Sequence, residues 1–446
     1  MTLDQPKVTS LFSGQMNRRT FLGGVLGTAA TASLLAACGG APAKSAGPVT
    51  VHFWGGVPAD KGPNDLVAAF NKLHPDIKVI YTRYVNDAPG NVKLDTALSA
   101  NGLVDVFVDY VPAYMFKRID AGASQDLSSY IAQDKEVKQW VDSTQGIVKV
   151  KGTYFGLPTA TDTGGYFLNK TLLEKTGIKM PQQWTVDEFH AIAKEVSGKN
   201  VYGTFDTPDL AFAKYGANAN YKDAHTSNFD DPIFRQSLEL HRNMIVEKSA
   251  FPWTEVMAQN LRVYSQSTYL KGQVLMGYAQ GTWIRYIADT TNYPHDFVTA
   301  FAPIPTPTGV DQPYSPGGLG SWIHLNTRSQ NKEAAWTFLR YHLTDGAKYM
   351  IPSGRIPAFP GTDVNTSING ILGPKKDQVF DVESYKRLHF DTPAKYSVPT
   401  ISTASAEITK ILQDQTDRYL IGEINIDTWV SNVKQQSDTA IRNAGN

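Results

Sequence analysis

Two aspartates, Asp109 and Asp162, are the residues whose type could support catalysis. A glycoside hydrolase uses a pair of carboxylates across a cleft, and these two could supply such a pair. Carboxylates that only accept hydrogen bonds from sugar hydroxyls follow the same sequence pattern, and the sequence does not give the separation of the two groups. No H-E-x-x-H, G-x-S-x-G or P-loop spacing occurs, and no pair of the nine histidines has metal-ligand spacing beside a carboxylate. We therefore expect that the protein is not an enzyme, and that it has no catalytic residue, no bound metal and no cofactor.

Asp162 lies in a polar stretch between two apolar runs. The segment 154–177 reads YFGLPTATDTGGYFLNKTLLEKTG, and it begins as a short apolar strand that a proline ends. A buried strand rarely contains Thr-Asp-Thr-Gly-Gly, so the stretch indicates a backbone that passes from one packed body to another. An ordinary loop is the alternative interpretation.

Asp109 ends one of several strand-like runs near the beginning of the chain. Strands are expected at 49–54, 77–84 and 105–109, and helices at 64–73, 92–100 and 113–121, the first capped by Asn64. This alternation predicts a parallel sheet with helices on both faces, and ligands of such sheets bind at the carboxyl ends of the strands. Trp54 and Asp109-Tyr110 lie at such ends, although Trp54 could equally be a core residue.

Length and composition are typical of a large soluble fold. The chain has 446 residues, 41% of them hydrophobic, which is enough for two lobes. Lysine plus arginine and aspartate plus glutamate number 42 each, and this balance argues against nucleic acid as a partner.

The first 48 residues look like an export and anchoring segment. Arg18-Arg19 precede a weakly hydrophobic run at 23–37, which resembles a twin-arginine signal, with Met16 as an alternative start to Met1. The run ends Leu-Ala-Ala-Cys38-Gly, which resembles a lipobox, where the cysteine is acylated after cleavage. We expect a signal peptide over 1–37, then a lipid anchor and tether over 38–48, and a bacterial lipoprotein at the outer face of the cell membrane.

Several motifs together resemble one family. The stretch 154–177 matches Y-x-G-x-P-x-x-x-D-T-G-G-x-x-x-N-K, followed seven residues later by Gly177. Three shorter matches lie further along the chain: P-x-x-W-T-x-D-E-F at 181–189, Gly-Thr-Trp at 281–283 and N-K-E-A-A-W at 331–336. They resemble the sugar-binding, maltose-binding-protein-like cluster of extracellular solute-binding proteins, the receptors of ABC importers.

The resemblance implies a fold and a set of partners. The expected fold is α/β and two-lobed, of the periplasmic-binding-protein type, with each lobe a mostly parallel sheet flanked by helices and a hinge of several strands. The predicted lobes are 49–161 plus 314–346 and 162–313 plus 347–446. The receptor, expected to be a monomer, would capture a mono- to oligosaccharide and deliver it to the permease subunits of an importer. A surface receptor that feeds a sensor is the first alternative, and a carbohydrate-active enzyme using Asp109 and Asp162 is the second.

The resemblance also implies a ligand site. The aromatic side chains expected to stack on a sugar are Trp54, Tyr110 and Trp283. The side chains expected to hydrogen-bond its hydroxyl groups are Asp109, Asp162 and Thr163, and Arg355 would contact a ring oxygen or an acidic group. Asp206 and the backbone at Gly317-Gly318 complete the expected set. Trp283 could instead be a core residue, with Ile284 and Ile287 continuing a buried helix face.

Overall fold

The computed structural model describes residues 47–100 and 103–445. The predictions that concern Arg18, Arg19 and Cys38 lie outside these residues. Among the described residues, no helix combines the length and the apolar character that a membrane span requires.

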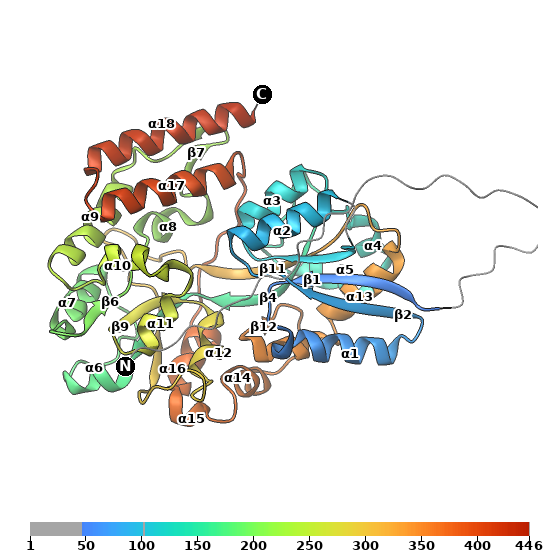
Figure 1. Ribbon diagram of the computed structural model, residues 1–446, viewed down its shortest axis with the longest axis horizontal. Coiled ribbons are helices and arrows are strands. Elements are labelled where there is room, and N and C mark those ends of the chain that lie inside the picture. The colour runs from blue at the N-terminus through green and yellow to red at the C-terminus, as the bar shows by residue number, and fades with distance from the viewer. Residues whose placement is uncertain (1–46, 101–102, 446) are drawn as a thin grey trace, which may run out of the picture. The chain divides into compact units, whose positions relative to one another are not determined.

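The larger of the two main sheets has six strands in the order β12-β4-β11-β3-β1-β2 (Figure 1). Its strands are β1 (Val49–Gly55), β2 (Ile77–Arg83), β3 (Val106–Asp109), β4 (Leu157–Thr163), β11 (Gly317–Leu325) and β12 (Ile356–Pro357). β1 pairs in parallel with β2 and β3, which confirms the parallel arrangement expected for the first three strands. β11 is antiparallel to both β3 and β4, and β12 is antiparallel to β4.

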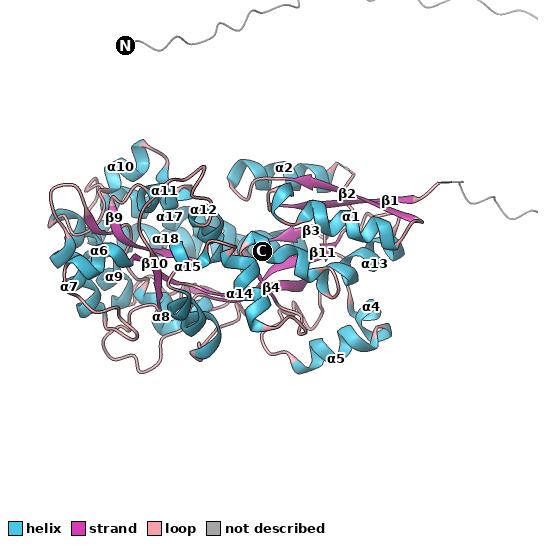
Figure 2. Ribbon diagram, turned by 90° about the horizontal axis from the view of Figure 1, so that it is seen from below, coloured by secondary structure: helices cyan, strands magenta, loops and turns pink. Residues whose placement is uncertain are grey.

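Helices cover both faces of this sheet (Figure 2). They are α1 (Pro63–Leu73), α2 (Ala88–Ser99), α3 (Pro112–Asp120), α4 (Ser128–Gln133), α5 (Lys135–Ser143) and α13 (Lys332–Leu343). Alternation along β1 turns Phe53 toward the apolar residues of α1 and α13, while Phe107 of β3 faces the cluster under α2. The predicted cap of the first helix was wrong: α1 begins at Pro63, whose fixed φ suits the first helical position, and Gly62 is the N-cap.

The second main sheet has four strands in the order β10-β5-β9-β6. They are β5 (Gly165–Asn169), β6 (Tyr202–Thr204), β9 (Val274–Ala279) and β10 (Thr299–Ala302), and a separate pair is formed by β7 (Tyr221–Asp223) and β8 (Thr226–Ser227). β6 is parallel to β9, whereas β5 is antiparallel to both of its neighbours.

The remaining helices lie in two segments of the chain, one before β11 and one after β12. The first holds α6 (Lys170–Lys175), α7 (Val186–Val196), α8 (Leu210–Tyr215), α9 (Pro232–Val246), α10 (Trp253–Ala258), α11 (Ser265–Leu270) and α12 (Ile284–Ile287). The second holds α14 (Val364–Leu372), α15 (Lys376–Val379), α16 (Val382–Lys386), α17 (Ser405–Leu420) and α18 (Ile426–Ala444). The capping box predicted at the start of α7 is present: Thr185 Oγ1 accepts from the Glu188 backbone N–H, and Glu188 Oε2 accepts from the Thr185 N–H.

The chain passes between the two sheets along β4 and β11. Only Gly164 separates β4, in the larger sheet, from β5, in the smaller one. β11 runs antiparallel to β4 from Gly317, opposite Thr163, to Ile323, opposite Leu157. The polar stretch around Asp162 is therefore a crossing between two packed bodies, as its composition indicates. After α13 the chain still adds β12 to the larger sheet before α14, and the predicted lobe boundaries stay a prediction.

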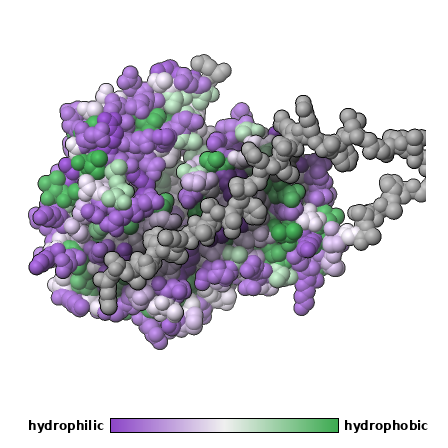
Figure 3. All heavy atoms as spheres, viewed as in Figure 1, coloured by the Kyte–Doolittle hydropathy of each residue, from purple (hydrophilic) through white to green (hydrophobic). Residues whose placement is uncertain are grey.

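The surface is mostly polar on the face shown in Figure 3, where apolar residues form small separate groups. Scattered apolar residues of this kind are normal on a soluble protein.

Candidate ligand site at the strand crossing

The loops that follow β1 and β3 meet at the carboxyl end of the larger sheet. Tyr110 comes directly after β3, and its hydroxyl oxygen accepts a hydrogen bond of 2.7 Å from the backbone N–H of Gly56. Tyr81 donates its hydroxyl to the carbonyl of Val57 at 2.6 Å. These bonds fix two aromatic side chains at the edge where ligands of parallel sheets bind.

Arg355 lies over this aromatic group. Its guanidinium carbon is 5.2 Å from the centroid of the Tyr110 ring, a cation–π distance. Its Nε donates to Ser321 Oγ and its Nη1 to Ser353 Oγ, both at 3.2 Å. No ion pair joins Arg355 to a carboxylate of the described residues, and burial lowers the pKa of its guanidinium. This cation, held by hydroxyl groups, remains able to bind an oxygen of a ligand.

Ser321 is a site residue that the sequence analysis did not identify. It has a φ of 53°, in the left-handed region that serine rarely adopts, and it interrupts the β11–β4 pairing, which skips from Gly320 to Trp322 without a change of register. Its carbonyl accepts from Thr159 Oγ1 at 2.8 Å, which joins the interrupted position to β4. Strained backbone of this kind concentrates at functional sites. The only sequence signal for this irregularity is the glycine-rich run at 317–320.

Asp162 links the crossing to the smaller sheet. Its Oδ2 accepts from the backbone N–H of Gly281, in the loop after β9, at 2.9 Å, and its Oδ1 accepts from the Thr163 N–H at 2.8 Å. Burial raises the pKa of Asp162 to about 6, although these two bonds and the charge of Arg355 act in the opposite direction. Its side chain is still 27% exposed, so a ligand could reach it. We call Tyr110, Asp162, Ser321 and Arg355 the crossing cluster.

The remaining predicted residues of the crossing lie beside this cluster. Thr163 is buried and its hydroxyl hydrogen-bonds the hydroxyl of Tyr396, a tyrosine that is 38% exposed and absent from the predicted set. Gly317 has a φ of 118° and Gly318 one of 82°, and a Cβ on Gly317 would lie 2.4 Å from the Asp162 carbonyl oxygen. Glycine is needed here for both conformation and space.

Asp206 belongs to a second group of residues at the end of β6. Its Oδ1 accepts from the Tyr278 backbone N–H at 2.9 Å, and burial raises its pKa to about 7. It lines a pocket of about 230 Å³, which we call the aspartate pocket; the lining residues are Tyr166, Asp206, Thr207, Pro208, Asp209, Phe212, Tyr278, Ile304 and Pro316. Pro316 connects this pocket to the crossing, because its carbonyl accepts from the Gly164 N–H at 2.7 Å. The sequence analysis identified only Asp206 of these.

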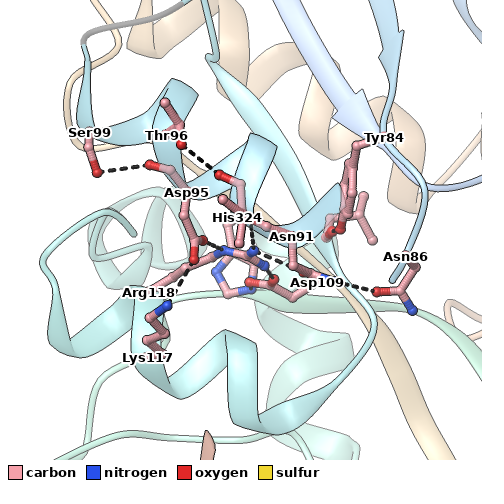
Figure 4. A network of polar contacts seen from close by, with 12 residues as sticks. Tyr84, Asn86, Asn91, Asp95, Thr96, Ser99, Asp109, Lys117, Arg118 and His324 are labelled. Carbon is pink, nitrogen blue, oxygen red and sulfur yellow. Dashed lines mark hydrogen bonds and ion pairs between the residues drawn. The ribbon is translucent and has the colours of Figure 1, made fainter. Parts of the chain in front are cut away.

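Asp109 lies away from any surface, in the polar network of Figure 4. It is fully buried and forms an ion pair with Arg118, which also binds Asp95 through Nε at 2.7 Å. His324 Nε2 is 3.4 Å from Asp109 Oδ2, and His324 Nδ1 donates to the Phe155 carbonyl at 2.8 Å. Burial raises the pKa of Asp109 to about 6 against the opposing effect of Arg118. In this conformation Asp109 connects α2, α3, β3 and β11 and offers no atom to a ligand.

The two predicted tryptophans also lie outside the crossing cluster. Trp54 is half-buried beside α2, where its Nε1 donates to the Leu103 carbonyl at 2.9 Å. Trp283 is 7% exposed and packs in the hydrophobic core beside the smaller sheet, with its ring 5.8 Å from Phe167 and 5.5 Å from Tyr269. The burial of Trp283 agrees with the core alternative that the sequence left open, whereas Trp54 is neither a buried core residue nor part of the crossing cluster.

The space between these groups is small. The cavity lined by Tyr110, Ser321 and Arg355 has about 10 Å³, which holds about one water molecule. No group of three or more histidine, cysteine, aspartate or glutamate side chains within the described ranges could hold a metal ion.

The chain matches one family model and several known proteins. The family model of bacterial extracellular solute-binding proteins matches residues 56–349. A putative binding protein of Brucella abortus is 26% identical over 265 residues, which are 56% of this chain and 60% of the relative. The chain thus spans about 60% of the length of the curated relatives that it matches, and a Brucella suis protein gives the same values.

Solved structures share the fold over nearly their whole length. A substrate-binding protein of an ABC transporter from Listeria monocytogenes, in complex with cycloalternan, has a TM-score of 0.72 at 20% identity and covers 89% of this chain and 99% of its own. A solute-binding protein from Thermotoga lettingae bound with α-D-tagatose has a TM-score of 0.70 at 19% identity, with coverage of 88% and 100%. The acarbose-binding GacH receptor of Streptomyces glaucescens has a TM-score of 0.69 at 19% identity, and the alignment covers 89% of this chain and 99% of the receptor. These similarities confirm the two-lobed periplasmic-binding-protein fold.

Because the family model matches well over half of the chain, the protein belongs to the bacterial extracellular solute-binding proteins, the family that its motifs resemble.

Proposed function

We propose that this protein is an extracytoplasmic receptor that captures a carbohydrate between its two lobes and delivers it to an ABC importer. The observation that carries the proposal is the crossing cluster. It combines an aromatic face, a cation held by hydroxyl groups and a partly exposed carboxylate, at the point where the chain passes between the sheets. Sugars present apolar ring faces and hydroxyl groups that both donate and accept, so they need this mixture of partners.

The crossing cluster would bind a sugar from one side of the crossing strands. Arg355 would donate to a ring or hydroxyl oxygen, and Asp162 would accept from a hydroxyl. Tyr110 would supply the apolar face. The aspartate pocket, in the half that contains the smaller sheet, would bind the other side of the ligand. A ligand that contacts both lobes stabilises the conformation in which they are close, which is how a solute can drive closure.

The structural relatives support a carbohydrate as the solute. The Listeria, Thermotoga and Streptomyces proteins were solved with cycloalternan, α-D-tagatose and acarbose, respectively. The glycoside hydrolase alternative would need Asp109 as one of its two carboxylates, and that side chain is fully buried against Arg118. We therefore favour binding without chemistry.

The N-terminal segment completes the proposal. Arg18-Arg19 and the apolar run would direct export, and acylated Cys38 would hold the receptor at the outer face of the membrane, near its permease. A single receptor copy per ligand would suffice. The permease, the monomeric state and the lipid anchor are parts of this proposal.

A thermal-shift screen of the full chain against a carbohydrate panel tests the proposal. A ligand present at 100 times its Kd stabilises the native state by about 2.7 kcal/mol, enough to shift the melting temperature by several degrees. We expect a small set of related saccharides to raise the melting temperature. If none of the mono-, di- and oligosaccharides does so while amino acids, peptides or polyamines do, the carbohydrate assignment is wrong.

A further inference from the structure

The aspartate pocket has an unusual charge balance. Two of its lining residues, Asp206 and Asp209, are carboxylates, and none of its lining residues is lysine, arginine or histidine. Both carboxylates accept hydrogen bonds from backbone N–H groups: Asp206 from Tyr278 at 2.9 Å and Asp209 from Phe212 at 3.0 Å. Neither forms an ion pair with any described residue. Burial raises the pKa of each, as expected for carboxylates without a nearby cation.

Other carboxylates of the protein, unlike those of the aspartate pocket, form ion pairs with arginines. Asp109 and Asp95 are bound by Arg118, and Asp134 is bound by Arg340 at 2.7 Å. In the aspartate pocket, Asp206 is half-buried, and Asp209 is exposed and is the N-cap of α8. A carboxylate that is partly removed from water is costly unless a cation or hydrogen bonds compensate it. Two carboxylates in one pocket, each held only by backbone groups, leave room for a positive charge that the protein itself does not supply.

An unpartnered hydroxyl also points to a ligand in this pocket. Tyr166 is completely buried and lines the pocket, and its hydroxyl oxygen has no hydrogen-bond partner among the described residues. Burial raises the pKa of this hydroxyl, and the charges of Asp206 and Asp209 add to the effect, so the group lies within electrostatic reach of both carboxylates. Buried polar groups normally have partners, and an unpartnered one in a pocket marks a place for a ligand atom.

The pocket favours an organic cation over a metal ion. No three metal-ligating side chains come together among the described residues, so a divalent cation would lack a ligand set. Phe212 and Tyr278 add aromatic rings to the lining, and aromatic faces attract ammonium groups. A primary ammonium has three N–H donors, which matches two carboxylates and one tyrosine hydroxyl as acceptors.

We propose that the aspartate pocket is a subsite for a protonated amino group, and that the preferred solute is an amino sugar or another basic saccharide. This inference rests on the proposed function and specifies the class of its ligand. Asp206 and Asp209 would accept from the ammonium, and the Tyr166 hydroxyl oxygen would accept its third N–H. The crossing cluster would bind the neutral part of the same molecule.

Calorimetric titration of the full chain with matched saccharides tests the inference. The probes are glucose, glucosamine and N-acetylglucosamine, together with cellobiose and the corresponding disaccharide of two glucosamine units. Within the monosaccharides and within the disaccharides the sugar skeleton is the same, and the probes differ in whether one position carries a hydroxyl, a charged ammonium or a neutral acetamide. We expect an amino sugar to bind at least tenfold more tightly than its neutral and N-acetylated counterparts at pH 7.

Conservative variants connect the preference to the pocket. D206N and D209N keep an oxygen that can accept the same backbone N–H, so both should fold, and a melting curve verifies this. Each should reduce the affinity for the amino sugar about tenfold and change the affinity for the neutral sugar less than threefold. D223N, at an exposed aspartate of β7, is the matched control and should change neither.

The possible outcomes separate this inference from the function on which it rests. If neutral saccharides bind as tightly as amino sugars, or if D206N and D209N weaken both equally, the amine subsite is wrong and the carbohydrate receptor stands. If amines without a sugar, such as polyamines, bind and no saccharide does, the proposed function fails together with the inference.

Discussion

At the scale of single residues, the same residue type has different roles that depend on its partners. Asp109 is neutralised by Arg118 in the interior, Asp162 bridges two loops through backbone N–H groups, and Asp206 lines a pocket with no cation beside it. All three were predicted as ligand residues: Asp109 from its place at the end of a strand, Asp162 from the polar crossing stretch and Asp206 from the family resemblance. Ion-pair partners come from distant parts of the chain, so the sequence could not separate these roles.

Trp283 gives the first prediction at this scale. Because its ring is buried against Phe167 and Tyr269, W283A should lower the free energy of unfolding by about 3–5 kcal/mol, as for other large aromatic residues removed from a core. Urea denaturation measures the loss, and W283F should lose distinctly less. A W283A protein with native stability and no sugar affinity would support the stacking role instead.

Asp206 gives a prediction for pH. Its pKa is about 7 in the folded protein against an ordinary value of 3.8, so between these values the folded state holds a proton that the unfolded state lacks. The stability contribution of this carboxyl therefore falls as pH rises from about 4 to about 7. D206N has no such group, so relative to the wild type it should gain about 1–3 kcal/mol between pH 4.5 and pH 8, since one pKa unit corresponds to about 1.4 kcal/mol. Denaturation of both unliganded proteins at the two pH values measures the difference, and a stability gap independent of pH would contradict it.

Cys38 gives a prediction for the N-terminal segment. C38A removes the thiol that would be acylated, so the protein should leave the membrane fraction and appear in soluble fractions of the expressing cell. Fractionation with immunodetection measures this, and serine substitution at a distant threonine, T439S, is a neutral control. Equal retention of C38A and wild type in the membrane fraction would refute the anchor.

At the scale of elements, local signals predicted more than long-range pairing did. The capping box of α7 and the parallel strands β1–β3 follow from short motifs and from strand–helix alternation, and both were predicted correctly. The crossing at Asp162 was predicted from its composition. The left-handed conformation of Ser321 and the Tyr166 hydroxyl, which has no partner among the described residues, arise only when β11 and the aspartate pocket assemble, so no local pattern predicts them. The N-cap at Asn64 was wrong because a proline at the next earlier position competes for the start of the helix.

The crossing strands carry the prediction for this scale. G317A places a side chain at a φ of 118° and a Cβ 2.4 Å from the Asp162 carbonyl oxygen, so it should destabilise the protein by about 1–3 kcal/mol. G320A, in the same strand, is the matched control, because its φ is not positive and no atom lies within 4 Å of the added Cβ. Chemical denaturation of both variants distinguishes them. Similar stabilities would show that β11 tolerates a different path at the crossing.

At the scale of the whole molecule, β4 and β11 join the two sheets, and in the proposed function the two halves close about these crossing strands. The loop contact between Asp162 and Gly281 and the close approach of the Gly281 and Gly354 backbones join the halves beside the proposed ligand. A solute held by the crossing cluster and the aspartate pocket would favour the closed arrangement, because only that arrangement satisfies both sets of contacts. Capture and closure are therefore one process in this account.

Small-angle scattering of the full chain, with and without a saccharide of proven affinity, tests this central claim most directly. The account predicts that the radius of gyration falls at saturating ligand and stays unchanged with a non-binding sugar of the same size. A ligand that binds with full occupancy and leaves the radius of gyration unchanged would contradict it.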